Sequence, residues 1–179
     1  MPTHARDRLI KAAEELFYAE GIRAVGLERL LAASGVGRAS FYRHFPGKDD
    51  LVVAVVRGAG ERVLRWLTNE VKARGGEPLA VFEALAERFT HSGFRGCVAI
   101  NTIVEYADPD SAAHRVAAEH KEDVIRYLDG LLAAAGQPQH AELARQFMLL
   151  FDGAMVTALR ERTPQPARRA KAVAAALLE

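Results

Sequence analysis

The chain has 179 residues, of which 50% are hydrophobic, with a formal net charge of +1 and a single cysteine. This size supports one large or two small domains with a substantial core, and one cysteine excludes an internal disulfide and a cysteine-rich zinc site. The near-neutral charge argues against general coating of nucleic acid, and no uncharged apolar run approaches the about 20 residues of a membrane helix. We therefore expect a soluble, cytoplasmic protein with no membrane contact.

Three helices are expected at the N-terminus. Apolar residues at helical spacing predict a first helix over about 4–20, which ends at Gly21. A second short helix begins near residue 27 and ends at Gly35, and a third runs from about 37 to 44. Two short helices joined by a tight turn are typical of a helix-turn-helix, whose second helix enters the major groove of DNA.

The third helix has a buried face and a face free for DNA. Phe41 and Phe45 are four residues apart, so they share one side and can pack on the preceding helix. The side chains that then point elsewhere are donors suited to phosphates and base edges: Arg38, Ala39, Ser40, Tyr42, Arg43 and His44.

Positive charge is concentrated in this segment. Residues 21–48 contain five basic residues and one acid, a net charge of +4 in a chain of only +1. Such a local basic patch is the electrostatic footprint expected of a DNA-binding surface. The same pattern also fits a solvated helical hairpin, or a helical interaction module that docks on an acidic protein.

The segment resembles the DNA-binding domain of the TetR (tetracycline-repressor) family of bacterial regulators over about residues 6–56. The matching features are Gly21, Leu27, the Ala32-Ala33 pair, Gly35-Val36, Phe41-Tyr42, Phe45, Lys48 and the apolar start of the next helix. Two positions depart from the family pattern, because Gly26 and Gly37 stand where a hydroxyl residue is usual. We therefore assign no side-chain phosphate contact to either glycine.

The resemblance implies a homodimeric transcription regulator, and it completes the expected DNA contacts. Contacts to phosphates are assigned to Ser40, Tyr42, His44 and Lys48, and contacts to bases are assigned to Arg38, Ala39 and Arg43. Lys48 beside a helix N-terminus suits a phosphate clamp, and each arginine could bind a guanine bidentately. The double-stranded operator is expected to be palindromic, and a small-molecule inducer is expected to release the repressor through the long fourth helix. In the cell, the DNA-bound protein would lie on the bacterial nucleoid.

The remainder of the chain is predicted to be helical, which makes the protein all-α. The expected helices cover about 48–72, 78–89, 97–107, 111–135, 139–162 and 166–179, nine in all with the first three. No segment alternates with period two for long enough to form a strand. The predicted domains are a helix-turn-helix domain at 1–47 and a helical ligand-sensing and dimerisation domain at 48–179.

The last two helices are the candidates for the dimer contact. Each carries an apolar stripe, and the residues assigned to the interface are Leu143, Phe147, Leu150, Ala154, Val173 and Leu177. Pairing both helices with their symmetry mates gives a four-helix interface, as the family fold implies. The alternative is that the stripes close the core of each monomer.

The sixth helix is the candidate lining of an effector pocket. Cys97, Asn101 and Glu105 are each four residues apart and therefore share one face of an otherwise apolar helix. The aromatic candidates for the same cavity are Trp66, Phe89, Tyr127, Phe147 and Phe151. The alternative is that Glu105 and Asn101 pair with groups of the protein itself and that the aromatic residues are plain core.

Two further functions would depend on Cys97. A neighbouring cation and the helix start would favour its thiolate, which predicts a redox- or electrophile-responsive regulator. A thiol-dependent enzyme with His91 lacks visible oxyanion machinery, and the sequence contains none of the common metalloprotease, esterase or phosphate-loop motifs. We therefore expect no enzyme activity, no metal and no cofactor.

Overall fold

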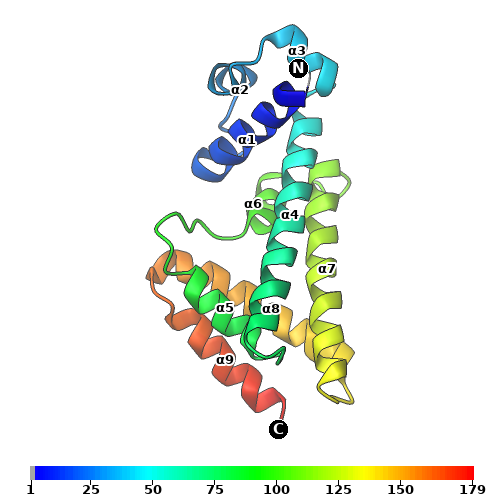
Figure 1. Ribbon diagram of the computed structural model, residues 1–179, viewed down its shortest axis with the longest axis vertical. Helices are drawn as coiled ribbons and strands as arrows, with labels where there is room; N and C mark the ends of the chain where they lie inside the picture. Colours follow the sequence, from blue (N-terminus) through cyan, green and yellow to red (C-terminus); the bar gives the residue numbers. More distant parts are fainter. Residues whose placement is uncertain (1–2) are drawn as a thin grey trace. The chain divides into compact units, whose positions relative to one another are not determined.

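The computed structural model describes residues 3–179, and within them it contains nine α-helices and no β-strand (Figure 1). The helices are α1 (Thr3–Glu20), α2 (Leu27–Ser34), α3 (Arg38–His44), α4 (Lys48–Ala73), α5 (Ala80–Arg88), α6 (Val98–Glu105), α7 (Ala112–Ala134), α8 (His140–Glu161) and α9 (Gln165–Leu177). The all-helical class is confirmed. The largest shifts from the predicted ends are at the start of α5, which begins after Pro78 and Leu79, at the end of α6, before Tyr106, and at the end of α9, at Leu177.

The described chain divides into two compact units. The first consists of residues 3–60 with 98–120, and the second of residues 61–97 with 121–179. The division falls inside α4 and assigns α6 and the start of α7 to the unit that holds the helix-turn-helix. The expected functional boundary after residue 47 stays a prediction.

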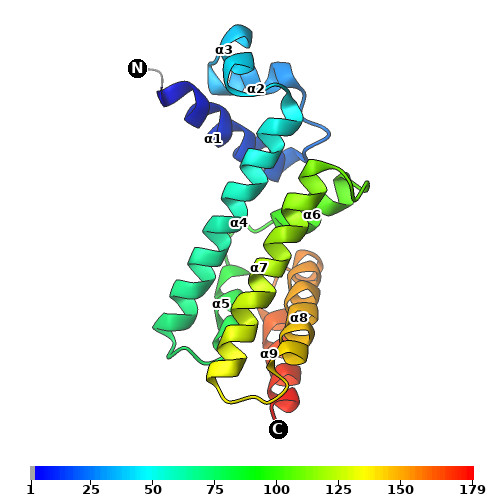
Figure 2. The same ribbon diagram turned by 90° about the vertical axis from the view of Figure 1, so that its right-hand side faces the viewer.

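In the first unit, α1 packs against α2 and α3 (Figure 2). The buried side chains of these three helices and of the start of α4 are Leu9, Ala13, Phe17, Leu30, Phe41, Phe45, Leu51 and Val52. Gly35 ends α2 in the left-handed conformation, with φ 61°, and its N–H donates to the carbonyl of Leu31. A left-handed C-terminal residue favours glycine because it has no Cβ to clash, and this turn directs the chain into α3.

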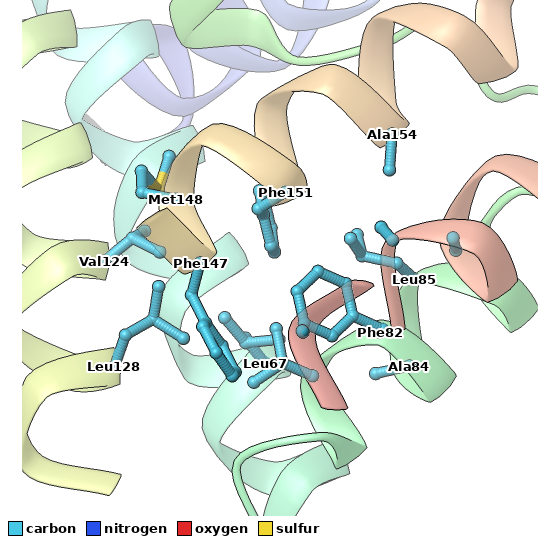
Figure 3. Packing of buried hydrophobic residues seen from close by; sticks show 14 of the residues in the cluster. Leu67, Phe82, Ala84, Leu85, Val124, Leu128, Phe147, Met148, Phe151 and Ala154 are labelled. Carbon is cyan, nitrogen blue, oxygen red and sulfur yellow. The ribbon is translucent and has the colours of Figure 1, made fainter. Parts of the chain in front are cut away.

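The second unit is built on one apolar cluster contributed by α4, α5, α7, α8 and α9 (Figure 3). At its centre the rings of Phe82 and Phe147 lie 5.5 Å apart between centroids, with Leu67, Leu85 and Leu128 fully buried around them. The extensive contact of α8 with α9 completes this core. In residues 3–179 no helix is both long and apolar enough to cross a membrane.

Candidate nucleic-acid interface

The turn and the N-terminus of α3 are formed by backbone rather than by capping side chains. Gly37, the N-cap of α3, is extended at φ −70° and ψ 151° and makes no side-chain cap hydrogen bond. Its carbonyl accepts from the N–H of Ser40 at 2.9 Å and of Phe41 at 3.0 Å. The missing hydroxyl noted at this position therefore does not prevent the helix from starting, because glycine tolerates an N-cap conformation well.

The two faces of α3 separate as the spacing predicted. Phe41 is 0% exposed and Phe45 only 3%, whereas Tyr42 is 50% exposed. The rings of Phe41 and Tyr42 meet edge to face at 5.2 Å, which sets the direction of the exposed phenol. The other side chains of the DNA-facing set are exposed at Arg38, Ala39 and Arg43 and half-buried at Ser40 and His44.

The two arginines of α3 differ in their partners. Arg38 forms an ion pair with Glu28 at the start of α2, and both side chains are exposed, at 57% and 74%. In residues 3–179 we find no hydrogen bond or ion pair of the Arg43 guanidinium. The guanidinium of Arg43 is therefore open to a further partner, whereas that of Arg38 is already paired with a carboxylate. The pairing of Glu28 was not predicted, although an acid ten residues before an arginine across a tight turn is a signal that could have suggested it.

Lys48 lies differently from the expected phosphate clamp. Its ammonium donates to the backbone carbonyl of Ile22 at 2.6 Å and lies 5.8 Å from the centre of the Phe17 ring. Burial of this ammonium lowers the pKa of Lys48 from its usual value, while the nearby carboxylates of Asp49 and Glu105 act in the opposite direction. The side chain thus fastens the start of α4 to the loop before α2, and the expected phosphate contact of Lys48 stays a prediction.

The carboxylate of Glu105 is bound by the loop between α1 and α2. Its two carboxylate oxygens accept from the backbone N–H groups of Ile22, at 3.0 Å, and Arg23, at 2.7 Å. The alternative weighed from the sequence, a carboxylate satisfied by the protein, is therefore the arrangement found, although its partners are amides rather than an arginine. Asn101, one turn earlier, is half-buried in α6.

Six of the eight residues expected around an effector come together in the second unit. Phe89, Phe147 and Phe151 are part of the buried cluster, and Trp66, Cys97 and Tyr127 are half-buried against it. Burial raises the pKa of the Tyr127 phenol, and the guanidinium of Arg88 lies 4.6 Å from the centre of the Trp66 ring. These positions fit core packing, and an effector pocket stays a prediction.

Two cavities open on the surface of the second unit. A cavity of about 410 Å³ lies between α5 and α9, and its lining residues include Phe82, Ala86, Glu83, Arg168 and Lys171. A smaller one of about 90 Å³ is lined in part by Trp66, Arg88 and His91. Of the residues predicted to bind an effector, only Trp66 lines either of these two cavities.

Three of the four α8 residues predicted for the dimer contact are buried within the subunit. Leu143, Phe147 and Ala154 are 8%, 0% and 4% exposed, so they belong to the core of the subunit, and Leu150 is half-buried against it. Instead, Leu149 and Val156 are 75% and 52% exposed. The predicted α9 residues Val173 and Leu177 are exposed, at 50% and 38%. Both faces of α8 carry apolar residues at helical spacing, so periodicity alone could not tell the inner face from the outer.

A family model described as "Bacterial regulatory proteins, tetR family" matches residues 9–55, from within α1 to the start of α4. The chain is also 33% identical to SCO4454, a TetR-family transcriptional regulator from Streptomyces coelicolor, whose crystal structure superposes with a TM-score of 0.89 over 99% of this chain and 90% of that one. The reduced form of Escherichia coli NemR shares the fold, with a TM-score of 0.85 at 22% identity over 95% of this chain and 94% of its own.

Among curated relatives, the chain is 34% identical over 85 residues to the HTH-type transcriptional repressor DrrR1 of Streptomyces coeruleorubidus. The match covers 48% of this chain and 30% of the repressor, so the chain spans less than a third of that protein. HTH-type transcriptional regulator YjdC of Escherichia coli is 22% identical over 84% of this chain and 81% of its own length.

Proposed function

The chain belongs to the TetR family of bacterial transcriptional regulators, and we propose that it is a homodimeric repressor that binds a palindromic operator through α3. The members of this family that it resembles are transcription regulators and not enzymes. Repression is proposed by analogy with DrrR1, which is named a repressor.

The observation that carries the proposal is the division of α3 into a buried aromatic face and an exposed polar face. Phe41 and Phe45 are buried and α3 packs on α1, so the exposed side chains are held on a rigid element. We assign base contacts to Arg38, Ala39 and Arg43, and phosphate contacts to Ser40, Tyr42 and His44. A phosphate contact of Lys48 is kept as a prediction beside this set, because its ammonium is already bound to the carbonyl of Ile22.

Dimerisation is proposed through the exposed apolar residues of α8 and α9. Leu149 and Val156 are seven residues apart and therefore on one face of α8, and Val173 and Leu177 are one turn apart on α9. Exposed apolar stripes of this kind mark interaction surfaces, and two copies related by a two-fold axis would bury both. A dimer also supplies the second recognition helix that a palindromic site requires, about 34–36 Å from the first or at a multiple of that distance.

Release from the operator is proposed to follow binding of a small molecule in the second unit. An effector acts only through a difference in its affinity for the DNA-bound and free conformations. The effector therefore has to bind more weakly to the operator-bound dimer than to the free one.

The direct test of DNA reading is selection of duplexes from a random-sequence pool by the purified protein, followed by titration of the selected duplex. We expect an inverted repeat, a stoichiometry of two chains or a multiple of two for each site, and affinity that falls steeply with salt. Recovery of unrelated sequences, with equal affinity for heparin and for every duplex, would instead indicate a module for acidic partners.

The dimer contact is tested by Val156→Glu, with Val104→Glu as the matched control. Val104 is also an exposed valine, at 73%, but it lies on α6. We expect Val156→Glu to produce monomers in sedimentation equilibrium, because it places a charge in the proposed apolar contact, and Val104→Glu to remain dimeric. A dimer that tolerates both changes equally would place the interface elsewhere.

A further inference from the structure

The larger of the two cavities lies at the surface of the second unit, beside its buried apolar cluster. It is formed where α5 and α9 lie side by side (Figure 1), and all of its lining residues belong to the second unit. Phe82, Ala86 and Pro164 supply apolar lining. Its volume of about 410 Å³ falls within the roughly 300–1,000 Å³ of small-molecule sites. The cavity is therefore large enough for a small organic molecule.

Four charged side chains line the same cavity, and they do not balance. The ammonium of Lys171 donates to the carboxylate of Glu83, and the carboxylate of Glu87 accepts from Arg74, which lies outside the lining. Among the described residues, 3–179, the guanidinium of Arg168 has neither a hydrogen bond nor an ion pair. Both acids of the lining are thus neutralised, whereas the charge of Arg168 is not. The cavity therefore offers a cationic group to a ligand and no free carboxylate.

The cavity and the proposed dimer contact lie on different flanks of α9. Arg168 and Lys171 line the cavity, whereas Val173 and Leu177 lie roughly 140–180° around the helix from Arg168, at about 3.6 residues per turn. The side of α9 between these flanks packs on the core through three buried alanines, Ala167, Ala170 and Ala174. A dimer formed through Val173 and Leu177 therefore leaves the cavity open to a ligand.

We propose that this cavity binds an organic monoanion, a carboxylic acid with a compact aromatic or aliphatic body. The body covers Phe82 and Ala86, and the carboxylate binds the guanidinium of Arg168. A planar guanidinium matches a carboxylate through two parallel hydrogen bonds, so Arg168 selects the anion and the apolar lining selects the body. This inference rests on the proposed function and deepens it, because it gives the small molecule of the second unit a chemical class and a site.

The ligand class is tested by calorimetric titration of the full chain, without DNA, with β-naphthoate, β-naphthamide and acetate. The amide keeps the aromatic body and lacks the charge, whereas acetate keeps the charge and lacks the body. We expect β-naphthoate to bind at least about tenfold more tightly than either, since it alone uses both the charged and the apolar parts of the site. Equal affinity for the naphthoate and the amide would overturn the assignment to an anion.

The role of Arg168 is tested by Arg168→Gln, with Arg169→Gln as the matched control. Both arginines are exposed residues of α9, but Arg169 is not part of the lining and pairs with Glu161. We expect Arg168→Gln to weaken β-naphthoate binding at least about fivefold and to leave β-naphthamide binding unchanged, because only the charged ligand uses the guanidinium. A loss of the same size in Arg169→Gln would mean that the general positive charge of α9, and not this site, attracts the ligand.

The apolar lining is tested by Ala86→Leu, with Ala133→Leu as the control. Ala86 is half-buried in the lining, whereas Ala133 is an exposed residue of α7. The larger side chain takes up cavity volume without a change of charge, so we expect β-naphthoate binding to fall at least about fivefold for Ala86→Leu only.

Amide hydrogen exchange of the wild-type protein locates the ligand without any variant. Bound β-naphthoate should slow exchange in residues 82–90 and 164–171. Slowing confined to other segments would place the ligand elsewhere and overturn the proposed site.

These measurements fail separately from the proposed function, because ligand binding is read without DNA. If the protein selects an operator but binds β-naphthoate no better than β-naphthamide, only the ligand site is overturned. If it binds β-naphthoate through Arg168 but prefers no duplex sequence, the proposed function fails and the binding site stands.

Discussion

The contacts within the first unit differ in kind from the contacts within the second. The second has a large apolar cluster in which Phe82, Leu85 and Phe147 are no more than 1% exposed. The first packs fewer large side chains and adds directional polar contacts, in which the carboxylate of Glu105 on α6 accepts from the N–H groups of Ile22 and Arg23. Apolar packing is strong and tolerant of direction, whereas hydrogen bonds specify orientation. The comparison teaches that the second unit is stabilised mainly by apolar packing, whereas the first unit adds contacts that fix the orientation of the helices proposed to read DNA.

Phe147→Ala gives the largest expected effect on this comparison. The ring is fully buried against Phe82, so its loss should lower the free energy of unfolding by about 3–5 kcal/mol. Urea unfolding followed by circular dichroism measures this change. The exposed Val104→Ala is the control and should cost less than about 0.5 kcal/mol.

At a temperature where Phe147→Ala is still folded, its preference between operator and scrambled DNA should equal that of the wild type. A changed preference without a change in stability would contradict the assignment to the first unit of the contacts that orient the reading helices.

Gly60→Ala should have the next largest effect. A Cβ on Gly60, in α4, would lie 2.9 Å from the ring of His120, on α7, and such overpacking typically costs about 1–3 kcal/mol. Gly130→Ala, on α7, meets nothing within 4 Å and should stabilise by about 0.5–1 kcal/mol through better helix propensity. Thermal unfolding of both variants tests the pair. Equal effects of the two alanines would mean that the close approach of α4 and α7 in the first unit is not as tight as described.

Tyr106→Phe sharpens the comparison on the polar side. It removes one hydrogen bond, to Asp49, while it keeps the ring beside Arg23. Burial and the hydrogen bond to Asp49 raise the pKa of the Tyr106 phenol, so the hydroxyl stays protonated and able to donate at neutral pH. We expect a loss of about 0.5–1.5 kcal/mol in unfolding free energy, measured by urea unfolding. An unchanged free energy would mean that the hydrogen bond to Asp49 does not stabilise the first unit.

The smallest effect is expected from Lys171→Ala. Its ammonium pairs with Glu83 across α9 and α5, and both side chains are more than a third exposed. Exposed pairs of this kind contribute about 0–1 kcal/mol, and the unfolding midpoint should hardly move. A shift as large as that of Gly60→Ala would show that surface charges, and not only the apolar cluster, hold the second unit.

Much of the fold could be predicted from the sequence, because helical periodicity, glycine ends and the spacing of Phe41 and Phe45 are local properties. The exposed face of α3 followed from the same spacing. What could not be predicted depends on contacts between residues far apart in the chain. Lys48 and Glu105 carry charges that suit phosphate or a pocket equally well, and only the fold brings both to Ile22.

The buried face of α8 could not be predicted for a second physical reason. Its sequence is apolar around most of its circumference, with Phe147 and Phe151 inward and Leu149 and Val156 outward. A helix of this kind is buried on one side by its own subunit, and its exposed side is the one proposed to contact a partner. The composition and the helical period of α8 do not distinguish its buried side from its exposed side, whereas its packing on α9 and α7 does.

The central claim is that α3 reads base sequence, and Arg43→Ala tests it most directly. The measurement compares its affinity for the selected operator and for a scrambled duplex at the same salt concentration. The account predicts that the variant loses about 1–3 kcal/mol on the operator and little on the scrambled duplex, because a bidentate base contact discriminates between sequences. Equal losses on both duplexes would contradict it, since Arg43 would then contact only the phosphate backbone.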